Sequence, residues 1–397
     1  MKFLIIEPEP NGHYVILYIK FIIRILSKKK HQLIFLTTRK AVNHKSFKII
    51  LQENPNIKIE YIRNVKPKNY TNISLIIYQI KLFFIIKKAV NKIYKKYHFD
   101  HIFLNSIDHI DKAMAFFGDP FKNIKFSGIL VNPKFHLAES NLGHSGRFNF
   151  FAKMLFKRLL RINNLKNILT NDYWFIKYTK DKNYDNYHKI HYLCEPREFR
   201  FNYKKIIARK KLNFPLNSIL ILVYGALKES KGIKELINIF KSIDINKNIK
   251  IVIAGQQDIY TKNLLKKQKI KNLISQNKIL ILDSFLDDKQ EGLLFSSVDL
   301  VWVAYRKNFP FLSGVLYQAA VKNLPILACN HGIINNINKK YKLGFSVDIE
   351  NLEQLVKKIN KICEKKNYNR FVKNSKALAK KANPIFFMKQ TYQSLIK

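Results

Sequence analysis

The feature that most limits the fold of this chain is the alternation of short apolar runs with longer amphipathic segments. Strands that alternate with helices pair in parallel, because each crossover helix returns the chain to the same end of the sheet. The pattern in the first half therefore predicts a parallel sheet with helices on both faces. The apolar runs of strand length in this half are KFLIIEP, HQLIFLTT, IKIEYI, HIFLNS at 101–106 and IKFSGILV at 124–131.

The second half continues the alternation and contains a glycine turn suited to an anion. The apolar run ILILVY at 219–224 precedes Gly225, and Lys231 precedes a segment with helical apolar spacing. This order places Lys231 and the Gly225 backbone at the carboxyl end of a strand, where open α/β sheets bind ligands. A phosphate fits such a site, and a solvated lysine at a helix start is the alternative interpretation.

A second segment suited to an anion is FLSGVLYQAAVKNLPILACNHGII at 311–334, a Ser-Gly turn that opens a helix and leads into a buried strand. Ser313 is expected to cap the helix, and Gly314 lets a ligand approach the backbone closely. The free N–H groups and the positive dipole end of such a helix attract a phosphate. An ordinary core helix capped by Ser313 is the alternative.

Together the two segments resemble the C-terminal domain of GT-B glycosyltransferases, most closely the large retaining family four. The family's strand, glycine, loop and Lys-Gly are followed here by IVIAG at 251–255, LDSFLDDKQ at 282–290, the Ser-Gly helix and PILACNHGI. The resemblance covers about 219–359. It implies an α/β chain with the GT-B fold, in which two Rossmann-like, doubly wound parallel-sheet domains face each other across a cleft.

The resemblance also implies a domain plan and a donor site. Residues 1–200 are expected to form the acceptor-side domain, 201–380 the nucleotide-sugar-binding domain, and 381–397 a helix that crosses back to the first. The expected donor-binding residues are Gly225, Lys228, Lys231, Gly255, Ser284, Phe285, Arg306, Ser313, Gly314, Val315 and Gln318.

Two departures from the family concern the donor site. The family usually has arginine after the first glycine, where this chain has Ala226, so Lys228, Arg306 or Lys307 is expected to supply the missing phosphate ligand. The family's two glutamates align with Pro310 and Gln318, neither of which is acidic. The Gln318 amide can still bond a ribose hydroxyl, because it offers both a donor and an acceptor.

On the acceptor side, the loop after the first strand carries Asn11, Gly12 and His13, which the resemblance places toward the donor phosphates and acceptor. The active-site histidine of the family aligns with Asn132 of this chain, and His136 follows four positions later. Asp108, next to His109, ends the preceding strand. Asn132, His136 and Asp108 are the candidate catalytic residues, and a structural role is the alternative for each.

The expected chemistry needs no cofactor beyond the nucleotide-diphosphate sugar itself. In retaining transfer by this fold, the leaving phosphate can accept the proton of the acceptor hydroxyl. The protein then positions both substrates and stabilises charge on the diphosphate, which suits Lys231 and the Ser313-Gly314 helix start. No metal is expected, because Asp287 and Asp288 fall in the loop near the base rather than in a DxD-type metal motif.

The chain is unusually basic, with 72 Lys and Arg against 27 Asp and Glu and a formal net charge of +45. Such a surface attracts nucleic acid or anionic lipid, although part of the charge reflects a bias toward Lys, Ile and Asn. Residues 147–168 interleave apolar and basic side chains like a helix at a membrane interface. Residues 73–97 are similar, but Lys81 interrupts them too early for a membrane span. Packed helices with solvated basic faces are the alternative, and no nucleic-acid-binding module is recognisable.

The location expected from the sequence is the cytoplasm, with peripheral attachment to the inner face of the membrane as an option. The three cysteines, Cys194, Cys329 and Cys363, are scattered and odd in number, which argues against a disulfide framework. The apolar start is interrupted by Glu7 and Pro8, which is too early for a signal peptide. At 397 residues and 47% hydrophobic content, the chain can bury two cores.

Three functions fit the sequence. The first is a glycosyltransferase that extends a glycan or a lipid-linked acceptor from a nucleotide-diphosphate sugar. The second, suggested by Ala226, Pro310 and Gln318, is a degenerate GT-B protein that binds nucleotide sugar or glycan without turnover. The third is another GT-B enzyme, such as a sugar-nucleotide epimerase, which would need further carboxylates and histidines. Activity separates the first two.

Overall fold

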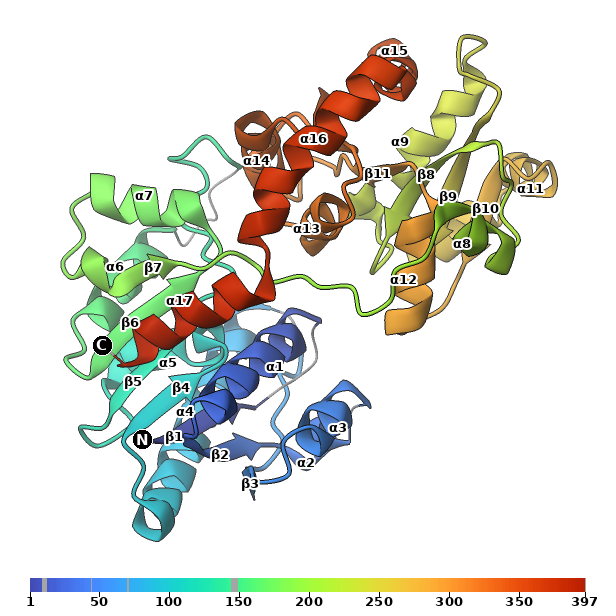
Figure 1. Cartoon of the computed structure of the whole chain (residues 1–397). Helices are drawn as coiled ribbons and strands as arrows, with labels where there is room; N and C mark the ends of the chain where they lie inside the picture. Colours follow the sequence, from blue (N-terminus) through green and yellow to red (C-terminus); the bar gives the residue numbers. More distant parts are fainter. Residues whose placement is uncertain (9–12, 44, 70, 144–148, 397) are drawn as a thin grey trace. The chain divides into compact units, whose positions relative to one another are not determined.

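The computed structural model describes residues 1–8, 13–43, 45–69, 71–143 and 149–396, and these form two compact units (Figure 1). Unit 1 contains the described residues of 1–140, 144–196 and 384–397. Unit 2 contains 141–143 and 197–383. Each unit is built around its own sheet, in which every described pairing is parallel. The predicted α/β class, with two doubly wound parallel sheets, is confirmed.

The sheet of unit 1 has seven strands in the order β3-β2-β1-β4-β5-β6-β7. The chain builds outward from β1 in one direction and then from β4 in the other. The order therefore reverses between β1 and β4, and the carboxyl ends of these strands form the edge at which open α/β sheets are expected to bind ligands. The strands are β1 (Lys2–Glu7), β2 (Gln32–Thr37), β3 (Lys58–Tyr61), β4 (His101–Leu104), β5 (Lys125–Ile129), β6 (Leu165–Thr170) and β7 (Ile190–Tyr192).

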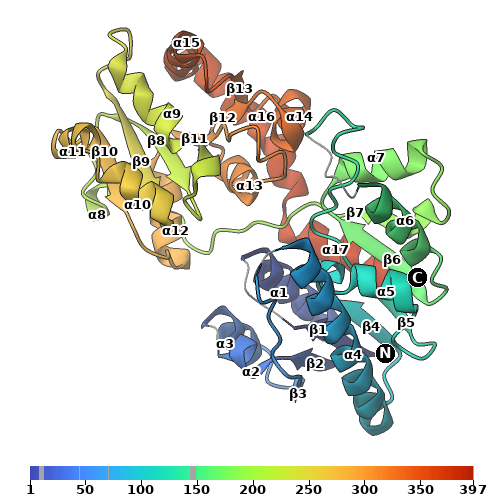
Figure 2. The same ribbon diagram turned by 180° about the vertical axis from the view of Figure 1, so that it is seen from behind.

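Helices cover both faces of this sheet, and its central strands are therefore buried on both sides. One apolar core joins α4 (Asn72–Tyr97), α5 (Asp111–Phe117), α6 (Asn149–Leu160) and α7 (Tyr173–Asp181) to one face (Figure 2). The other core joins α1 (His13–Lys28), α3 (Lys45–Gln52) and α17 (Pro384–Ile396) to the opposite face. The remaining short elements of the unit are α2 (Arg39–Val42), η1 (Ile107–His109) and η2 (Tyr187–Lys189).

The C-terminal helix α17 belongs to unit 1, although it follows the whole of unit 2 in the sequence. The Phe387 ring stacks on Tyr18 of α1, with centroids 5.6 Å apart and planes at 12°. The hydroxyl of Tyr392 lies 3.2 Å from Nε2 of His31, and Asn167 of β6 donates to the carbonyl oxygen of Ser394 at 2.5 Å. These contacts attach the chain end to α1, to the residue before β2 and to β6.

The sheet of unit 2 has six strands in the order β10-β9-β8-β11-β12-β13. The order reverses between β8 and β11, so the carboxyl ends of these two strands define the ligand-binding edge expected for this topology. The strands are β8 (Ile219–Tyr224), β9 (Ile249–Ala254), β10 (Ile279–Leu282), β11 (Leu300–Val303), β12 (Ile326–Cys329) and β13 (Gly344–Val347).

One face of this sheet forms an apolar core with α9 (Ile233–Ile237), α10 (Ile259–Leu265), α11 (Gln268–Ser275) and α15 (Leu352–Cys363). The segments that flank the carboxyl ends of β8 and β11 are η3 (Glu229–Lys231), α12 (Asp288–Ser297) and α13 (Gly314–Val321). The remaining elements are α8 (Lys205–Lys211), η4 (Asn238–Lys241), α14 (Gly332–Tyr341) and α16 (Lys365–Lys381).

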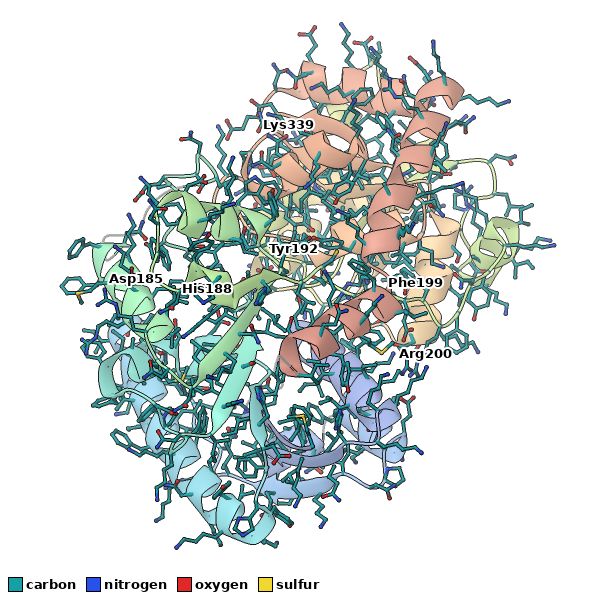
Figure 3. The ribbon with its side chains drawn as sticks, turned by 60° about the vertical axis from the view of Figure 1, so that its left-hand side comes forward. Asp185, His188, Tyr192, Phe199, Arg200 and Lys339 are labelled. Atoms are coloured by element: carbon teal, nitrogen blue, oxygen red, sulfur yellow. The ribbon has the colours of Figure 1, made fainter. Side chains whose placement is uncertain are left out.

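Basic side chains project from the surface of both units, as Lys339 of α14 does (Figure 3). Some of them have acidic partners, such as Arg161, whose guanidinium lies 2.8 Å from a carboxylate oxygen of Asp185. Among the described residues, no helix combines the length and apolar character that crossing a bilayer requires.

Candidate functional site

Two glycine turns lie next to each other at the carboxyl edge of the unit 2 sheet. Gly225 follows β8 with φ 103°, and Gly255 follows β9 with φ 126°, values that favour glycine. A Cβ placed on Gly255 would lie 2.0 Å from the carbonyl oxygen of Gly225. The two turns therefore pack backbone against backbone, and Gly225 donates to the carbonyl oxygen of Ala254 at 3.1 Å. No side chain of either residue covers this edge.

At the same edge of the sheet, a chain of hydrogen bonds connects the two segments predicted to bind phosphate. Nζ of Lys231 donates to the hydroxyl of Tyr305 at 2.7 Å, and that hydroxyl lies 3.0 Å from Oγ of Ser313. Lys231 comes from the loop after β8, whereas Tyr305 and Ser313 follow β11. The indole of Trp302 donates to the carbonyl oxygen of Lys231 at 2.7 Å and holds that loop against β11. Lys231 and Ser313 are thus brought together through Tyr305, which the sequence did not single out.

The pKa of Lys231 is lowered toward neutral pH. Burial, with a smaller contribution from the positive charge of Lys228, lowers its pKa to about 7. Its Nζ lies 4.0 Å from the centroid of the Tyr305 ring, so the ammonium faces the negative side of an aromatic ring rather than a carboxylate. A perturbed lysine at the ligand-binding edge of a sheet is typical of a functional site.

Ser313 occupies the N-cap position of α13, as predicted, but without the side-chain hydrogen bond that a cap usually makes. Ser313 has extended N-cap geometry, but its hydroxyl makes no cap hydrogen bond because it contacts Tyr305 instead. The first turn of α13 therefore begins without a side-chain cap. Gly314 and Val315, both expected to contact the donor, are buried within this turn.

Gln318, on the next turn of α13, contacts a carboxylate that the sequence did not indicate. Its Nε2 donates to Oε1 of Glu291 at 2.5 Å, and the hydroxyl of Tyr224 donates to the same oxygen at 2.6 Å. Burial raises the pKa of Glu291 above its ordinary value, while these two hydrogen bonds favour the charged form. Gln318 replaces the family's glutamate, and the acidic group at this place comes from α12.

The structure distinguishes the three cations proposed to replace the missing arginine. The guanidinium of Arg306 contacts Glu229 and lies 2.6 Å from Glu235. Lys307 is exposed and lies 3.2 Å from a carboxylate oxygen of Glu350. Lys228 is exposed at the start of η3, and no described carboxylate pairs with it. Lys228 is therefore the cation of the three that is available to an anion.

The loop expected near the nucleotide base is exposed. Ser284 and Phe285 lie in the segment between β10 and α12, and the Phe285 side chain is 67% exposed. Asp287 caps α12 and forms a reciprocal capping box with Gln290. The described residues contain no group of three or more metal-ligating side chains.

At the corresponding edge of unit 1, a fully buried carboxylate ends β1. Glu7 accepts a hydrogen bond from the Asn105 amide at 2.9 Å, and Nε2 of His109 lies 3.6 Å from its other oxygen. Asn105 and His109 follow β4, so this cluster lies where the strand order of unit 1 reverses. Glu7 was not predicted, although an acidic residue at the end of an apolar strand was a visible signal.

Two of the three candidate catalytic residues, Asp108 and His136, have side chains in structural contacts. Asp108 accepts hydrogen bonds from the backbone N–H groups of Val131 and Asn132, at 2.8 and 3.1 Å. The Asn132 residue is exposed beside this contact. His136 is fully buried, and its Nε2 lies 3.1 Å from Asp172, which also caps α7. A catalytic role for these residues stays a prediction. Asn11 and Gly12 lie outside the described residues, as does the side chain of His13.

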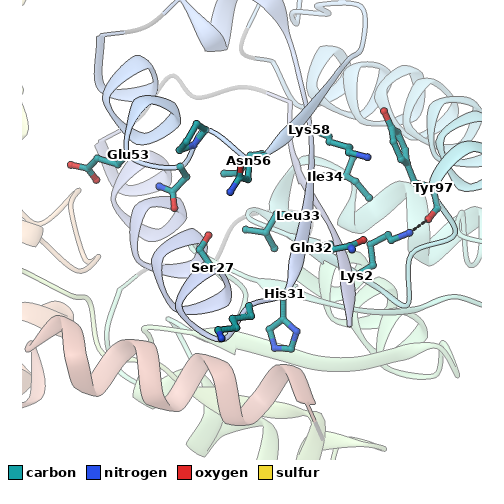
Figure 4. Close-up of a pocket in the computed structure, with 14 residues that line it drawn as sticks. Lys2, Ser27, His31, Gln32, Leu33, Ile34, Glu53, Asn56, Lys58 and Tyr97 are labelled. Atoms are coloured by element: carbon teal, nitrogen blue, oxygen red, sulfur yellow. Dashed lines mark hydrogen bonds between the residues drawn. The ribbon is translucent and has the colours of Figure 1, made fainter.

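Unit 1 also has a pocket at the other end of its sheet. The pocket has a volume of about 610 Å³ and lies at the amino ends of the first strands, lined by residues such as Lys2, His31 and Lys58 (Figure 4). It is remote from the carboxyl ends of β1 and β4, because parallel strands present their two ends at opposite edges of a sheet.

Comparison with known proteins agrees with the fold. Residues 204–378 match the model of the family described as glycosyl transferases group 1. Most of unit 2 therefore matches this family. The predicted resemblance is thereby confirmed, and the matched range contains Lys231, Tyr305 and Ser313. No curated protein matches the chain.

Solved glycosyltransferases share the GT-B fold of the whole chain. Sucrose-phosphate synthase from Thermosynechococcus elongatus superposes with a TM-score of 0.71 and 14% identity, covering 99% of this chain and 98% of that one. Anabaena HepE in complex with UDP gives 0.69 and 15%, covering 100% of both chains. A glycosyltransferase from Rickettsia africae gives 0.66 and 18%, covering 99% and 97%.

Proposed function

We propose that the protein is a glycosyltransferase that moves a sugar from a nucleotide-diphosphate donor to a glycan or a lipid-linked acceptor. The observation that carries this proposal is the Lys231–Tyr305–Ser313 chain at the carboxyl edge of a domain that matches the group 1 glycosyltransferase family. The proposal includes retention of configuration, a role in polysaccharide or glycolipid synthesis, and peripheral attachment to a membrane from the cytoplasmic side.

The donor diphosphate is assigned to the carboxyl edge of the unit 2 sheet, beside Gly225 and the start of α13. Lys231 contributes a cation there, and the start of α13 contributes the positive end of a helix dipole. A Cβ on Gly225 would meet only Val315, at 4.0 Å, so this turn leaves the backbone open to close approach. The nucleoside is assigned to the side of Gln318 and Glu291, and the exposed loop at Ser284 and Phe285 to the base. HepE has been crystallised with UDP-glucose, which makes a uridine donor the first to test.

In the proposed reaction the acceptor hydroxyl oxygen bonds to the anomeric carbon, on the face from which the diphosphate leaves, as the bond between that carbon and the diphosphate breaks. The diphosphate gains negative charge and takes the proton of the hydroxyl. Lys231 and the α13 helix start stabilise that charge, and their fixed positions avoid reorganisation during the step. The pKa of Lys231 is about 7 in the free protein, and the negative charge of a bound diphosphate favours the charged form of this lysine.

A thermal-shift screen against nucleotide-diphosphate sugars, coupled to release of nucleotide diphosphate, tests the proposal. One donor is expected to stabilise the protein and to be hydrolysed or transferred. Lys231→Ala is expected to weaken that donor by roughly 10-fold to 100-fold, because it removes a charge-assisted contact. Lys307→Ala is the matched control, since this lysine is exposed and pairs with Glu350. Equal effects of both variants, or no response to any nucleotide, would contradict the donor site.

A second function is favoured by the absence of glutamate at 310 and 318. In this alternative the protein binds a nucleotide sugar or glycan without turnover. Donor stabilisation that depends on Lys231, with no release of nucleotide diphosphate even when membrane extract is supplied as acceptor, is the result that would select it.

A further inference from the structure

Three neighbouring helices of unit 1 leave large apolar side chains in contact with solvent. These helices, α4, α5 and α6, cover the same face of the sheet and pack side by side (Figure 2). Contiguous exposed apolar area of this kind usually marks an interaction surface. The exposed apolar residues are Ile73, Ile76, Ile77, Phe84, Phe116, Phe117, Phe150, Phe151 and Met154, each at least 36% exposed.

On α4 the exposed residues form one stripe. Ile73, Ile77, Lys81, Phe84 and Lys88 are all exposed, and they follow one another at intervals of three or four residues. Such spacing brings side chains onto one face of a helix. The stripe therefore mixes apolar and basic side chains on the side of α4 that faces away from the core.

The end of α5 connects this stripe to α6. The Phe117 ring lies 5.3 Å from Phe84, centroid to centroid, and the guanidinium of Arg158 on α6 lies 5.9 Å from the centroid of Phe116. The surface is therefore continuous across the three helices. We call it the α4–α5–α6 surface.

On α6 the same mixture recurs. Phe151, Met154 and Arg158 are exposed at helical spacing, and Phe150 and Lys157 flank them. The Phe150 side chain is 75% exposed. Neither α4 nor α6 contains an aspartate or glutamate.

We propose that the α4–α5–α6 surface docks on an anionic lipid bilayer. Its phenylalanines and isoleucines are suited to the boundary between headgroups and acyl chains, and its lysines and arginine to anionic headgroups. No described carboxylate pairs with Lys81, Lys88 or Arg158, so these charges are available to lipid. The proposal rests on the membrane attachment included in the proposed function and locates it on particular residues.

The charge of the surface favours lipid over a second copy of the chain. A symmetric dimer through this surface would bring the basic side chains of the two copies together, and every copy carries a net charge of +45. A bilayer of anionic lipid presents the opposite charge over an extended plane. It also accepts the apolar side chains, which a purely electrostatic partner would leave exposed.

Vesicle flotation tests this assignment. Binding of the full chain is measured with vesicles of phosphatidylglycerol and phosphatidylcholine, and with phosphatidylcholine alone, at low and high salt. We expect binding to the anionic vesicles at low salt. The charge variant Lys81→Glu, Lys88→Glu and Arg158→Glu is expected to bind roughly 100-fold more weakly. The apolar variant Phe150→Ser and Phe151→Ser is expected to lose the binding that survives at high salt.

The matched control reverses three exposed lysines of unit 2, Lys269, Lys271 and Lys339, and so changes the net charge equally. If this control lost as much binding as the charge variant, net charge rather than the α4–α5–α6 surface would be responsible, and the proposal would be overturned. Absence of wild-type binding, or dimerisation in light scattering that the charge variant abolishes, would also overturn it. Donor stabilisation measured on each variant separates these outcomes from a failure of the donor site.

Discussion

The Nζ atom of Lys231 lies 2.7 Å from the hydroxyl oxygen of Tyr305 and 4.0 Å from the centre of its ring. The tyrosine therefore meets the lysine both with its oxygen and with its aromatic face. Because the same hydroxyl lies 3.0 Å from Oγ of Ser313, Tyr305 fixes the distance between the two predicted phosphate ligands. A single phenol thus organises the candidate donor site.

Tyr305→Phe tests this organisation. The substitution keeps the ring over Lys231 but removes the hydroxyl that accepts its hydrogen bond. We expect donor affinity to fall by roughly 5-fold to 10-fold, and stability by about 1 kcal/mol, because a net hydrogen bond of this kind contributes that much. Titration calorimetry with the donor and urea denaturation measure the two effects. Unchanged donor affinity in a folded variant would show that Tyr305 does not position the site.

The low pKa of Lys231 predicts how donor affinity changes with pH. A bound diphosphate raises this pKa from about 7, so binding takes up a proton at and above neutral pH. Affinity should therefore decline as pH rises from 7 to 9, by up to about tenfold per unit while the bound lysine stays charged. Calorimetry in buffers of different ionisation enthalpy measures the proton uptake. Lys231→Met should abolish this dependence, and a decline that persisted in it would point to another group.

Lys231 also predicts the opposite trend for the stability of the free protein. Its folded pKa, about 7, is below its ordinary value of 10.5. Between these values the unfolded chain binds more protons at this site than the folded chain does. The contribution of Lys231 to the free energy of unfolding should therefore increase from pH 7 to 10.5. The difference between wild type and Lys231→Met in urea denaturation at several pH values isolates it.

Much of the fold could be predicted because its signals are local. Apolar runs of strand length, such as ILILVY before Gly225, identify each strand from adjacent residues. Parallel strands end at one edge, so the sequence also indicated that Lys231 and Ser313 lie at the same edge. The details of the site depend on contacts between distant segments. Tyr305 ends an apolar run and resembled a strand residue.

The carboxylate at Glu291 shows the limit of the sequence most clearly. Its contact with Gln318 joins two helices, and 27 positions separate the residues. Nothing in the local spacing of either helix indicates which side chains face each other across the gap. The acidic partner of Gln318 is therefore visible only in the packing.

Gly255→Ala is expected to destabilise unit 2 strongly. A methyl group there would lie 2.0 Å from the carbonyl oxygen of Gly225, and the φ of 126° is unfavourable to any L residue. We expect a loss of about 3 kcal/mol or more, because the contact is with backbone and cannot be relieved by a side-chain movement. Gly118→Ala is the control, since it has a φ of 78° but no atom within 4 Å of the added Cβ. Comparable losses in both variants would mean that backbone strain alone is responsible.

The Gln318–Glu291 pair offers a test by exchange. Gln318→Glu restores the residue typical of the family but places a second carboxylate at the 2.5 Å contact with Glu291. We expect this variant to lose roughly 1–3 kcal/mol of stability and to bind donor more weakly, because two like charges then share one partly buried site. Thermal and urea denaturation with donor titration measure both effects.

Adding Glu291→Gln to Gln318→Glu should recover most of the loss, because the double variant again has one amide and one carboxylate in contact. The Tyr224 hydroxyl donates to a carboxylate oxygen of Glu291 at 2.6 Å, and it can donate equally to the amide oxygen of a glutamine there. The double-mutant cycle then gives a coupling energy of about 1 kcal/mol or more. Additive effects of the two substitutions would show that the contact does not contribute, and that the carboxylate from α12 does not take the place of the family's glutamate.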